Sequence, residues 1–287
     1  MRCRRSCRLI ALLAIFAVPG CQLPSRDGPV SKSLATCRQL SQQGISAAER
    51  GQTKKATELL SKAVEACPID PEARQNYAES LWQAGTRREA IAQLEEATRL
   101  ASEDAMLRVR LAQMHLAAGD LVRARRSAEQ AIDLNPKLAD AWAIRGRIMR
   151  ADGQLRQSLA DYLRALGYAP SDQQLLLETA GLYQQLNQPQ RALATLYSLA
   201  DTYSPGEEPP ELLRSIGLVC MALQRREEGA KVFYRLAESE QTAGRPAEAE
   251  MAARQALALD PQHQASRELL GRLEMARLPQ GPASTRR

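Results

Sequence analysis

Small side chains recur every 34 residues along most of this 287-residue chain, with larger apolar residues three and four positions away. One row consists of Ala56, Ala90, Ala124, Ser158 and Ala192. A second row lies at Ala63, Ala97, Ala131 and Ala165, and a third at Gly44, Ala78, Ala112, Gly146 and Ala180. Small side chains let two helix backbones approach closely, so each period predicts two antiparallel helices packed against each other.

Turn residues mark the ends of these predicted helices. A positive φ is favoured where the first helix of each unit would end, at Gly51, Gly85, Gly119, Gly153 and Asn187. The second helix is followed by a proline, which cannot continue it, at Pro68, Pro136 and Pro170. One such unit cannot bury its apolar side alone, so the units are expected to stack into a continuous array.

Five units follow in unbroken register, beginning near Cys37, Pro71, Ala105, Ala139 and Gln173. The turn-rich segment 203–210 interrupts this register. A sixth unit is expected from Pro210, with Gly217 at its close-packing position, and a seventh from Ala230. The helix predicted at 225–241 would then serve both units, and a charged helix at 264–276 would cap the array.

These rows resemble the tetratricopeptide repeat, whose units are helical hairpins packed through small residues. The resemblance implies an all-α fold, a right-handed superhelical solenoid of about six to seven repeats over residues 35–277 with a C-terminal capping helix. It also implies a scaffold that binds other proteins.

The N-terminal segment reads as an export signal. Residues 1–8 carry four arginines and no acid, 9–18 are apolar, and Gly20 precedes Cys21. The apolar run is shorter than the roughly 20 residues that span a bilayer. The sequence predicts a signal peptide at 1–20, a spacer at 21–34 and a disordered tail at 278–287.

The segment Val18-Pro19-Gly20-Cys21 resembles a bacterial lipobox, although Pro19 departs from the usual small residue. The resemblance implies that Cys21 is lipidated and anchors the exported chain in a membrane, and Gln22 favours the outer membrane, facing the periplasm. Ordinary cleavage with a free Cys21 and an uncleaved anchor are the alternatives.

The net charge supports no nucleic-acid partner. The formal charge of +6 includes four leader arginines, so removing them leaves about +2. Nucleic-acid binding requires a clustered basic stripe, whereas charges of both signs are interspersed along these helices.

Two cysteines fall at the same end of the first predicted hairpin. Cys37 opens its first helix and Cys67 follows its second. They form either a disulfide, which suits an exported protein, or a pair of buried thiols. Cys220 is expected to be a core thiol.

The chain offers little for catalysis. Its two histidines, His115 and His263, lie at an expected packing position and in a loop. The sequence has no closely spaced cysteine pair for a metal and no glycine-rich phosphate loop after a strand. We therefore expect no enzymatic activity, no metal and no cofactor.

In the resembled family the concave groove is lined by the first helix of each repeat. The corresponding residues here are Gln75, Glu79, Trp82, Met106, Val109, Arg110, Gln113, Ile144, Arg147, Arg150, Leu177 and Gln184. Apolar members would bury a helix or an extended peptide, and Arg110 and Arg147 would fix it by charged hydrogen bonds. The alternative for each residue is packing against a neighbouring helix.

The family's chaperone-tail clamp is mostly missing. Asn76 and Arg110 match it, whereas Ser41, Ile45 and Met106 occupy its other positions. A cochaperone role is therefore not expected.

The combined features resemble envelope lipoproteins that assist type IV pilus secretin assembly or outer-membrane protein insertion. They predict a non-enzymatic, membrane-anchored scaffold for a protein or peptide of the cell envelope. The alternatives are a regulatory or adaptor subunit for a peptidoglycan enzyme and a self-associating structural lipoprotein. The residues fix neither the partner nor the oligomeric state.

Overall fold

The computed structural model describes residues 32–277, and all regular secondary structure in this range is helical. The helices are α1 (Lys32–Glu49), α2 (Thr53–Ala66), α3 (Pro71–Gln83), α4 (Arg87–Leu100), α5 (Ala105–Ala117), α6 (Leu121–Leu134), α7 (Ala139–Ala151), α8 (Leu155–Tyr168), α9 (Gln173–Gln185), α10 (Pro189–Ala200), α11 (Pro210–Ala222), α12 (Arg226–Thr242), α13 (Pro246–Leu259) and α14 (Gln264–Arg277). The signal peptide, Cys21, spacer residues 22–31 and the tail at 278–287 lie outside the described residues. Residues 32–34, expected in the spacer, belong to α1.

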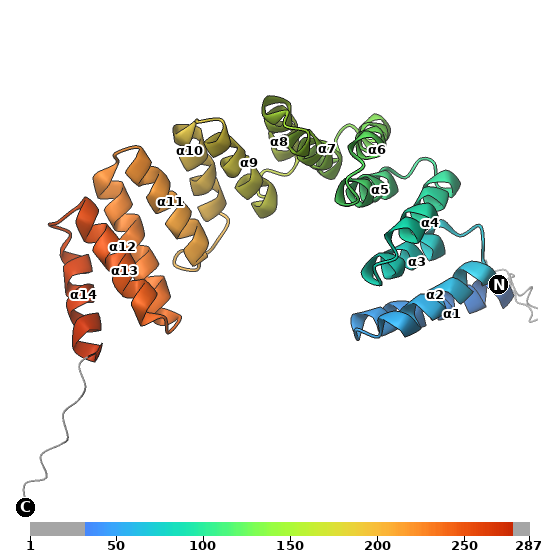
Figure 1. Ribbon diagram of the computed structural model, residues 1–287, viewed down its shortest axis with the longest axis horizontal. Helices are drawn as coiled ribbons and strands as arrows, with labels where there is room; N and C mark the ends of the chain where they lie inside the picture. The colour runs from blue at the N-terminus through green and yellow to red at the C-terminus, as the bar shows by residue number, and fades with distance from the viewer. Residues whose placement is uncertain (1–31, 278–287) are drawn as a thin grey trace, which may run out of the picture.

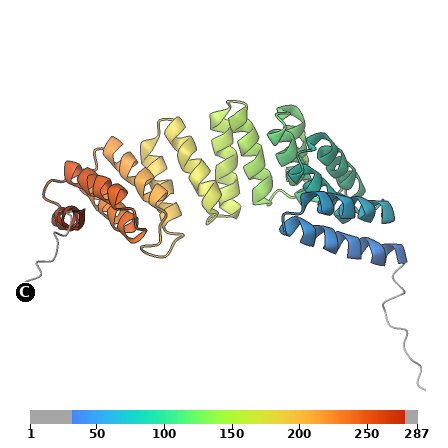
Figure 2. The same ribbon diagram turned by 60° about the horizontal axis from the view of Figure 1, so that its bottom comes forward.

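The helices follow one another along an open arc, with α1 and α14 at its opposite ends (Figures 1 and 2). Each helix packs against its neighbours in the chain, and contacts between distant helices are rare. This arrangement confirms the all-α, superhelical fold that the 34-residue period predicts.

The turn inside each hairpin requires a left-handed residue. φ is 73° at Gly51, where a side chain would be strained, and the same turn is made by Asn187 at 55°. Gln224 makes it at 58° in the sixth hairpin. The turn geometry therefore persists where glycine is absent, at some conformational cost.

Close helix packing explains the rows of small residues. A Cβ added at Gly146 in α7 would lie 2.5 Å from Cε1 of Tyr162 and nearer still to Cδ1. Tyr162 on α8 is fully buried, so its ring occupies the space that the missing side chain leaves. Gly217 holds the equivalent position against the ring of Phe233.

The 17-residue helix α12 accommodates the change of register near the C-terminus. A Cβ added at its Gly229 would lie 3.3 Å from Cβ of Cys220 on α11, as in a second helix, and 2.8 Å from Leu259 on α13. Its Ala237 lies seven residues before the turn at Gly244, as in a first helix, and is fully buried. α12 packs against both α11 and α13, so one helix completes two hairpins.

Two buried carboxylates hold this region together. Glu240 on α12 is 3% exposed and accepts hydrogen bonds from Arg214 at 3.0 Å and Arg245 at 2.5 Å. Glu208, in the segment before α11, pairs with Arg235 and accepts the Gly206 N–H at 3.0 Å. Burial opposes ionisation of Glu208, but these backbone and arginine contacts prevail and lower its pKa.

No helix between Lys32 and Arg277 combines the length and apolar character that crossing a bilayer requires.

Candidate functional site

The first helices of successive hairpins are joined by ion pairs. Arg110 on α5 reaches Glu79 on α3, with Nε 2.5 Å from Oε1 and Nη2 bonded to Oε2. Its Nη1 donates to Gln113 at 3.0 Å. All three nitrogens of Arg110 therefore have acceptors within the protein.

A second pair joins α7 to α9 with the charges in the opposite order. Arg147 Nε donates to both oxygens of Glu178, at 3.0 and 2.9 Å. Gln174 donates to Glu178 Oε1 at 3.0 Å. Burial lowers the pKa of Arg147, but its contact with Glu178 prevails and raises it.

Both pairs join residues 31 positions apart. The equivalent pair between α5 and α7 would be Gln113 and Ile144, which cannot form an ion pair. The first helices of the hairpins carry side chains that are not buried, and we call the surface that these side chains form the inner face. Most of the residues predicted from the sequence belong to it, and their contacts differ.

Two predicted groove residues do not lie on the inner face. Val109 and Ile144 are each 1% exposed and belong to the apolar core around α7. The prediction of these two residues was wrong, because a first helix presents some of the groove positions taken over from the resembled family to the adjoining hairpin. Neither can contact a partner while the array is folded.

The other predicted residues are accessible to different degrees. Gln75, Trp82, Gln113 and Arg150 are half-buried, and Gln184 is exposed. Met106 and Leu177 are 51% and 53% exposed. Trp82 carries Arg87 over its ring, with Cζ 5.4 Å from the centroid.

Sequence reasoning missed two residues on α11. Leu218 and Met221 are 51% and 42% exposed. Gly217 aligns with Gly146, so Leu218 and Met221 correspond to Arg147 and Arg150 two units earlier. Aligning the unit after the insertion with the earlier units, by matching Gly217 to Gly146, would have identified both residues as groove positions.

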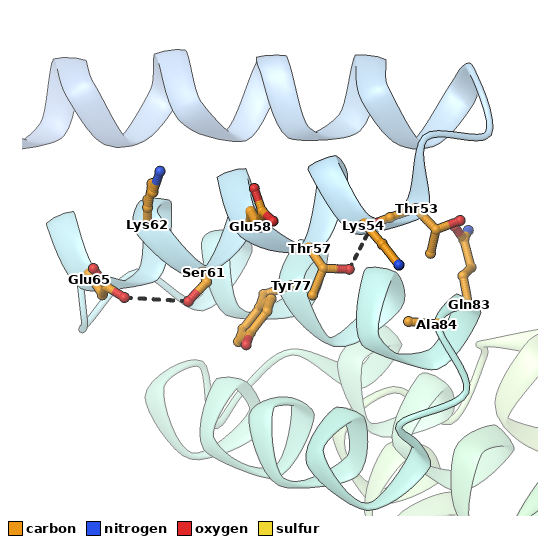
Figure 3. Close-up of a pocket in the computed structure, with 10 residues that line it drawn as sticks. All are labelled: Thr53, Lys54, Thr57, Glu58, Ser61, Lys62, Glu65, Tyr77, Gln83 and Ala84. Carbon is orange, nitrogen blue, oxygen red and sulfur yellow. Dashed lines mark hydrogen bonds between the residues drawn. The ribbon is translucent and has the colours of Figure 1, made fainter.

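A cleft of about 840 Å³ lies between α2 and α3 and was also missed (Figure 3). Hydroxyl residues line its α2 wall, at Thr53, Thr57 and Ser61. Later units carry larger side chains at the position of Thr57: Ile91, Arg125, Leu159 and Leu193. Lys54, Lys62, Glu58 and Glu65 give the cleft balanced charge, so it does not select an ion by charge.

Cys37 and Cys67 are free thiols in the structure. Cys37 is 1% exposed, and its Sγ donates to Asp70 Oδ2 at 3.7 Å. Cys67 Sγ donates to the Ser33 carbonyl oxygen at 3.6 Å. Burial and the nearby Cys67 and Asp70 raise the pKa of Cys37 to about 12, so its thiol stays protonated.

The two histidines are far apart in the chain and serve local contacts. His115 is 3% exposed, with Nε2 3.7 Å from Glu95 Oε1, and burial lowers its pKa despite that carboxylate. His263 Nδ1 lies 2.8 Å from Ser266 Oγ at the start of α14. Within residues 32–277, no three metal-ligating side chains converge.

Comparison with protein families identifies the repeats. The family model described as "Tetratricopeptide repeat" matches residues 41–105, 77–139 and 234–277. No curated protein sequence matches the chain.

Solved structures share the architecture. PilF from Pseudomonas aeruginosa has a TM-score of 0.59 at 15% identity, over 84% of this chain and 99% of that one. A tetratricopeptide repeat protein from Parabacteroides merdae has a TM-score of 0.55 at 14% identity, over 84% and 99%. MamA from Desulfovibrio magneticus reaches 0.52 at 16% identity, over 58% of this chain and 94% of that one. At these identities the likenesses establish the fold alone.

Proposed function

Since this chain is an array of tetratricopeptide repeats, we propose that it is a non-enzymatic scaffold that binds a protein partner along its inner face. The observation that carries the proposal is the combination of exposed apolar side chains and charged groups on successive first helices. Met106, Leu177, Leu218 and Met221 are 42–53% exposed. Apolar contacts with neighbouring polar anchors are the usual composition of a peptide-binding surface.

The proposed setting is the cell envelope, with Cys21 lipidated and holding the array at the outer membrane. The support is the sequence around Cys21, which resembles a lipobox after an export signal. Acyl chains contribute roughly 0.8 kcal/mol per buried methylene to such an anchor. The pathway proposed from this combined architecture is pilus secretin or outer-membrane protein assembly.

The anchor and the binding face are tested separately. For the anchor, cells are grown with an alkyne-bearing fatty acid, and wild type is compared with Cys21→Ser. Label on wild type alone supports lipidation, and membrane recovery should fall in the variant. Equal labelling of both would refute lipidation at Cys21.

For the binding face, photo-crosslinking residues at Leu177 and Met221 are compared with one at Leu163, which is exposed on second helix α8. Adducts with one defined envelope protein at the first two sites, and none at Leu163, would support the proposal. A secretin or an assembly protein would name the pathway, and a peptidoglycan enzyme would favour the adaptor alternative. Adducts only with a second copy of the chain would favour self-association.

A further inference from the structure

We propose that the middle of the inner face is a carboxylate-binding site formed by Arg147 and Arg150, with an apolar contact surface beside it at Leu177, Leu218 and Met221. The ligand class is a peptide segment with an acidic group followed by apolar residues. This inference rests on the proposed function and specifies the chemistry of its partner.

The two ion-paired arginines differ in the number of guanidinium nitrogens that have an acceptor within the protein. Arg110 has an acceptor at each of its three nitrogens. Arg147 engages Glu178 through Nε alone, which leaves Nη1 and Nη2 available. Its side chain is 28% exposed, so a ligand can reach these donors.

Arg150 adds a second set of donors beside them. It lies one helical turn after Arg147 on α7, close enough for like charges to repel. It is half-buried, and its guanidinium makes no hydrogen bond or ion pair with the described residues. A partly desolvated arginine without an acceptor favours binding of an anion.

A buried hydroxyl supports the same location independently. Tyr162 on α8 is fully buried, and its hydroxyl meets no acceptor in hydrogen-bond geometry among residues 32–277. Burial is the largest cause that raises its pKa, followed by the charge of Glu178 and the approach of the hydroxyl to that carboxylate, whereas Arg147 and Arg150 lower it. The hydroxyl therefore lies at this charged cluster, where it can donate to Glu178 if a ligand draws Arg147 away.

The charge balance favours a carboxylate. Arg147 pairs directly with one carboxylate, that of Glu178, and Arg150 has no such partner among the described residues. Asp172 also acts on Arg147, and its side chain accepts the Leu175 N–H at 3.0 Å as the N-cap of α9. This neutral donor leaves the charge of Asp172 in place, so Glu178 and Asp172 together offset the charges of Arg147 and Arg150. A site without excess positive charge suits a singly charged carboxylate better than a dianionic phosphate. The planar guanidinium also matches carboxylate geometry.

The apolar surface gives the ligand a direction. Leu177 neighbours Glu178 on α9, and Leu218 and Met221 occupy the same register positions two units beyond Arg147 and Arg150. Two unit spacings of roughly 10 Å correspond to about six residues of extended chain. The acidic group and the apolar residues should therefore be separated by about six positions.

The test is selection of random 12-residue peptides displayed on phage against the purified protein. Peptides selected by wild type should be enriched in Asp or Glu, with Leu, Ile, Phe or Met about six positions away. Arg150→Gln should remove the acidic enrichment and keep the apolar one. The double variant Leu218→Ser with Met221→Ser should do the reverse.

Arg156→Gln is the matched control, because Arg156 is exposed on α8 and makes no ion pair with the described residues. It should leave both enrichments unchanged. For a selected peptide, Arg150→Gln should weaken binding about tenfold or more, as expected for a charged hydrogen bond. Tyr162→Phe, which keeps the ring, should weaken it about threefold. Selected peptides that end at the acidic residue are compared with a free and with an amidated C-terminus. This comparison distinguishes binding of a terminal carboxylate from binding of a side-chain carboxylate.

Peptides that bind wild type without acidic enrichment, or that bind Arg150→Gln equally well, would overturn the carboxylate site and leave the scaffold function intact. Unchanged affinity in Tyr162→Phe would exclude the hydroxyl from the site. If no peptide is enriched on any variant while circular dichroism shows folded protein, the peptide ligand is overturned, and the crosslinking experiment at Leu177 and Met221 decides the proposed function by itself.

Discussion

Gly146→Ala should destabilise the array, although alanine is the better helix former. In the middle of a helix this change alone stabilises by about 0.5–1 kcal/mol. Here the new Cβ would lie 2.5 Å or less from ring atoms of Tyr162, with the Ser158 carbonyl oxygen at 3.3 Å. An ordinary contact needs about 3.4 Å or more, so a fully buried ring must move by roughly 1 Å. Overpacking of this kind costs about 1–3 kcal/mol, and the expected net loss is about 1–2 kcal/mol.

Gly181 in α9 is the matched control. It lies in the middle of a first helix, and an added Cβ would meet nothing within 4 Å. Gly181→Ala should therefore raise stability by about 0.5–1 kcal/mol. The two variants should differ by about 2 kcal/mol in free energy of unfolding.

The measurement is urea unfolding followed by far-ultraviolet circular dichroism. A second variant carrying Tyr162→Leu supplies the rescue, because the smaller side chain should reduce the cost of Gly146→Ala. If Gly146→Ala is as stable as Gly181→Ala, close packing does not explain the glycine at this position. The interpretation of the small-residue rows would then be wrong.

Three further predictions follow from individual side chains. Glu240→Gln should cost roughly 2–3 kcal/mol in urea unfolding, because it leaves Arg214 and Arg245 without their buried carboxylate; a loss below about 0.5 kcal/mol would contradict this. Burial lowers the pKa of His115, so the unfolded chain takes up the proton more readily, and the contribution of His115 to stability should be complete above pH ~6.5 and fall as pH decreases below it. The dependence of unfolding free energy on pH should be weaker in His115→Gln, and an unchanged dependence would refute the lowered pKa. With a pKa of about 12, about one Cys37 in 10⁴ carries a thiolate at pH 8, so mass spectrometry should show very slow alkylation by iodoacetamide, and rapid labelling would contradict the buried thiol.

The periodic part of the fold could be predicted from the sequence because each unit depends mainly on its neighbours. Gly85 and Ala90 mark a turn and a close helix contact in the second unit, and the same offsets recur in the units around it. Local preference and tertiary packing agree at such positions, so counting residues suffices. The same count assigned the helix at 225–241 to two units but could not show how the change of register is accommodated, because that depends on what packs on each side of α12.

The candidate site was predictable only as a set of positions. The register placed Arg110 and Arg147 together on the inner face but also included Val109 and Ile144, which belong to the core. It could not show that Arg110 is fully engaged by Glu79 while Arg147 keeps two nitrogens free.

Residue spacing alone predicts the all-helical array and the order of its first five hairpins, because helix spacing, turn chemistry and backbone approach are local requirements. Which charges are already paired, and which donors remain available, depends instead on how the units stack. That outcome depends on side chains from α3 and α5, or α7 and α9, meeting across units 31 residues apart. The geometry of stacking fixes such contacts, and the 34-residue rows of small side chains do not reveal them.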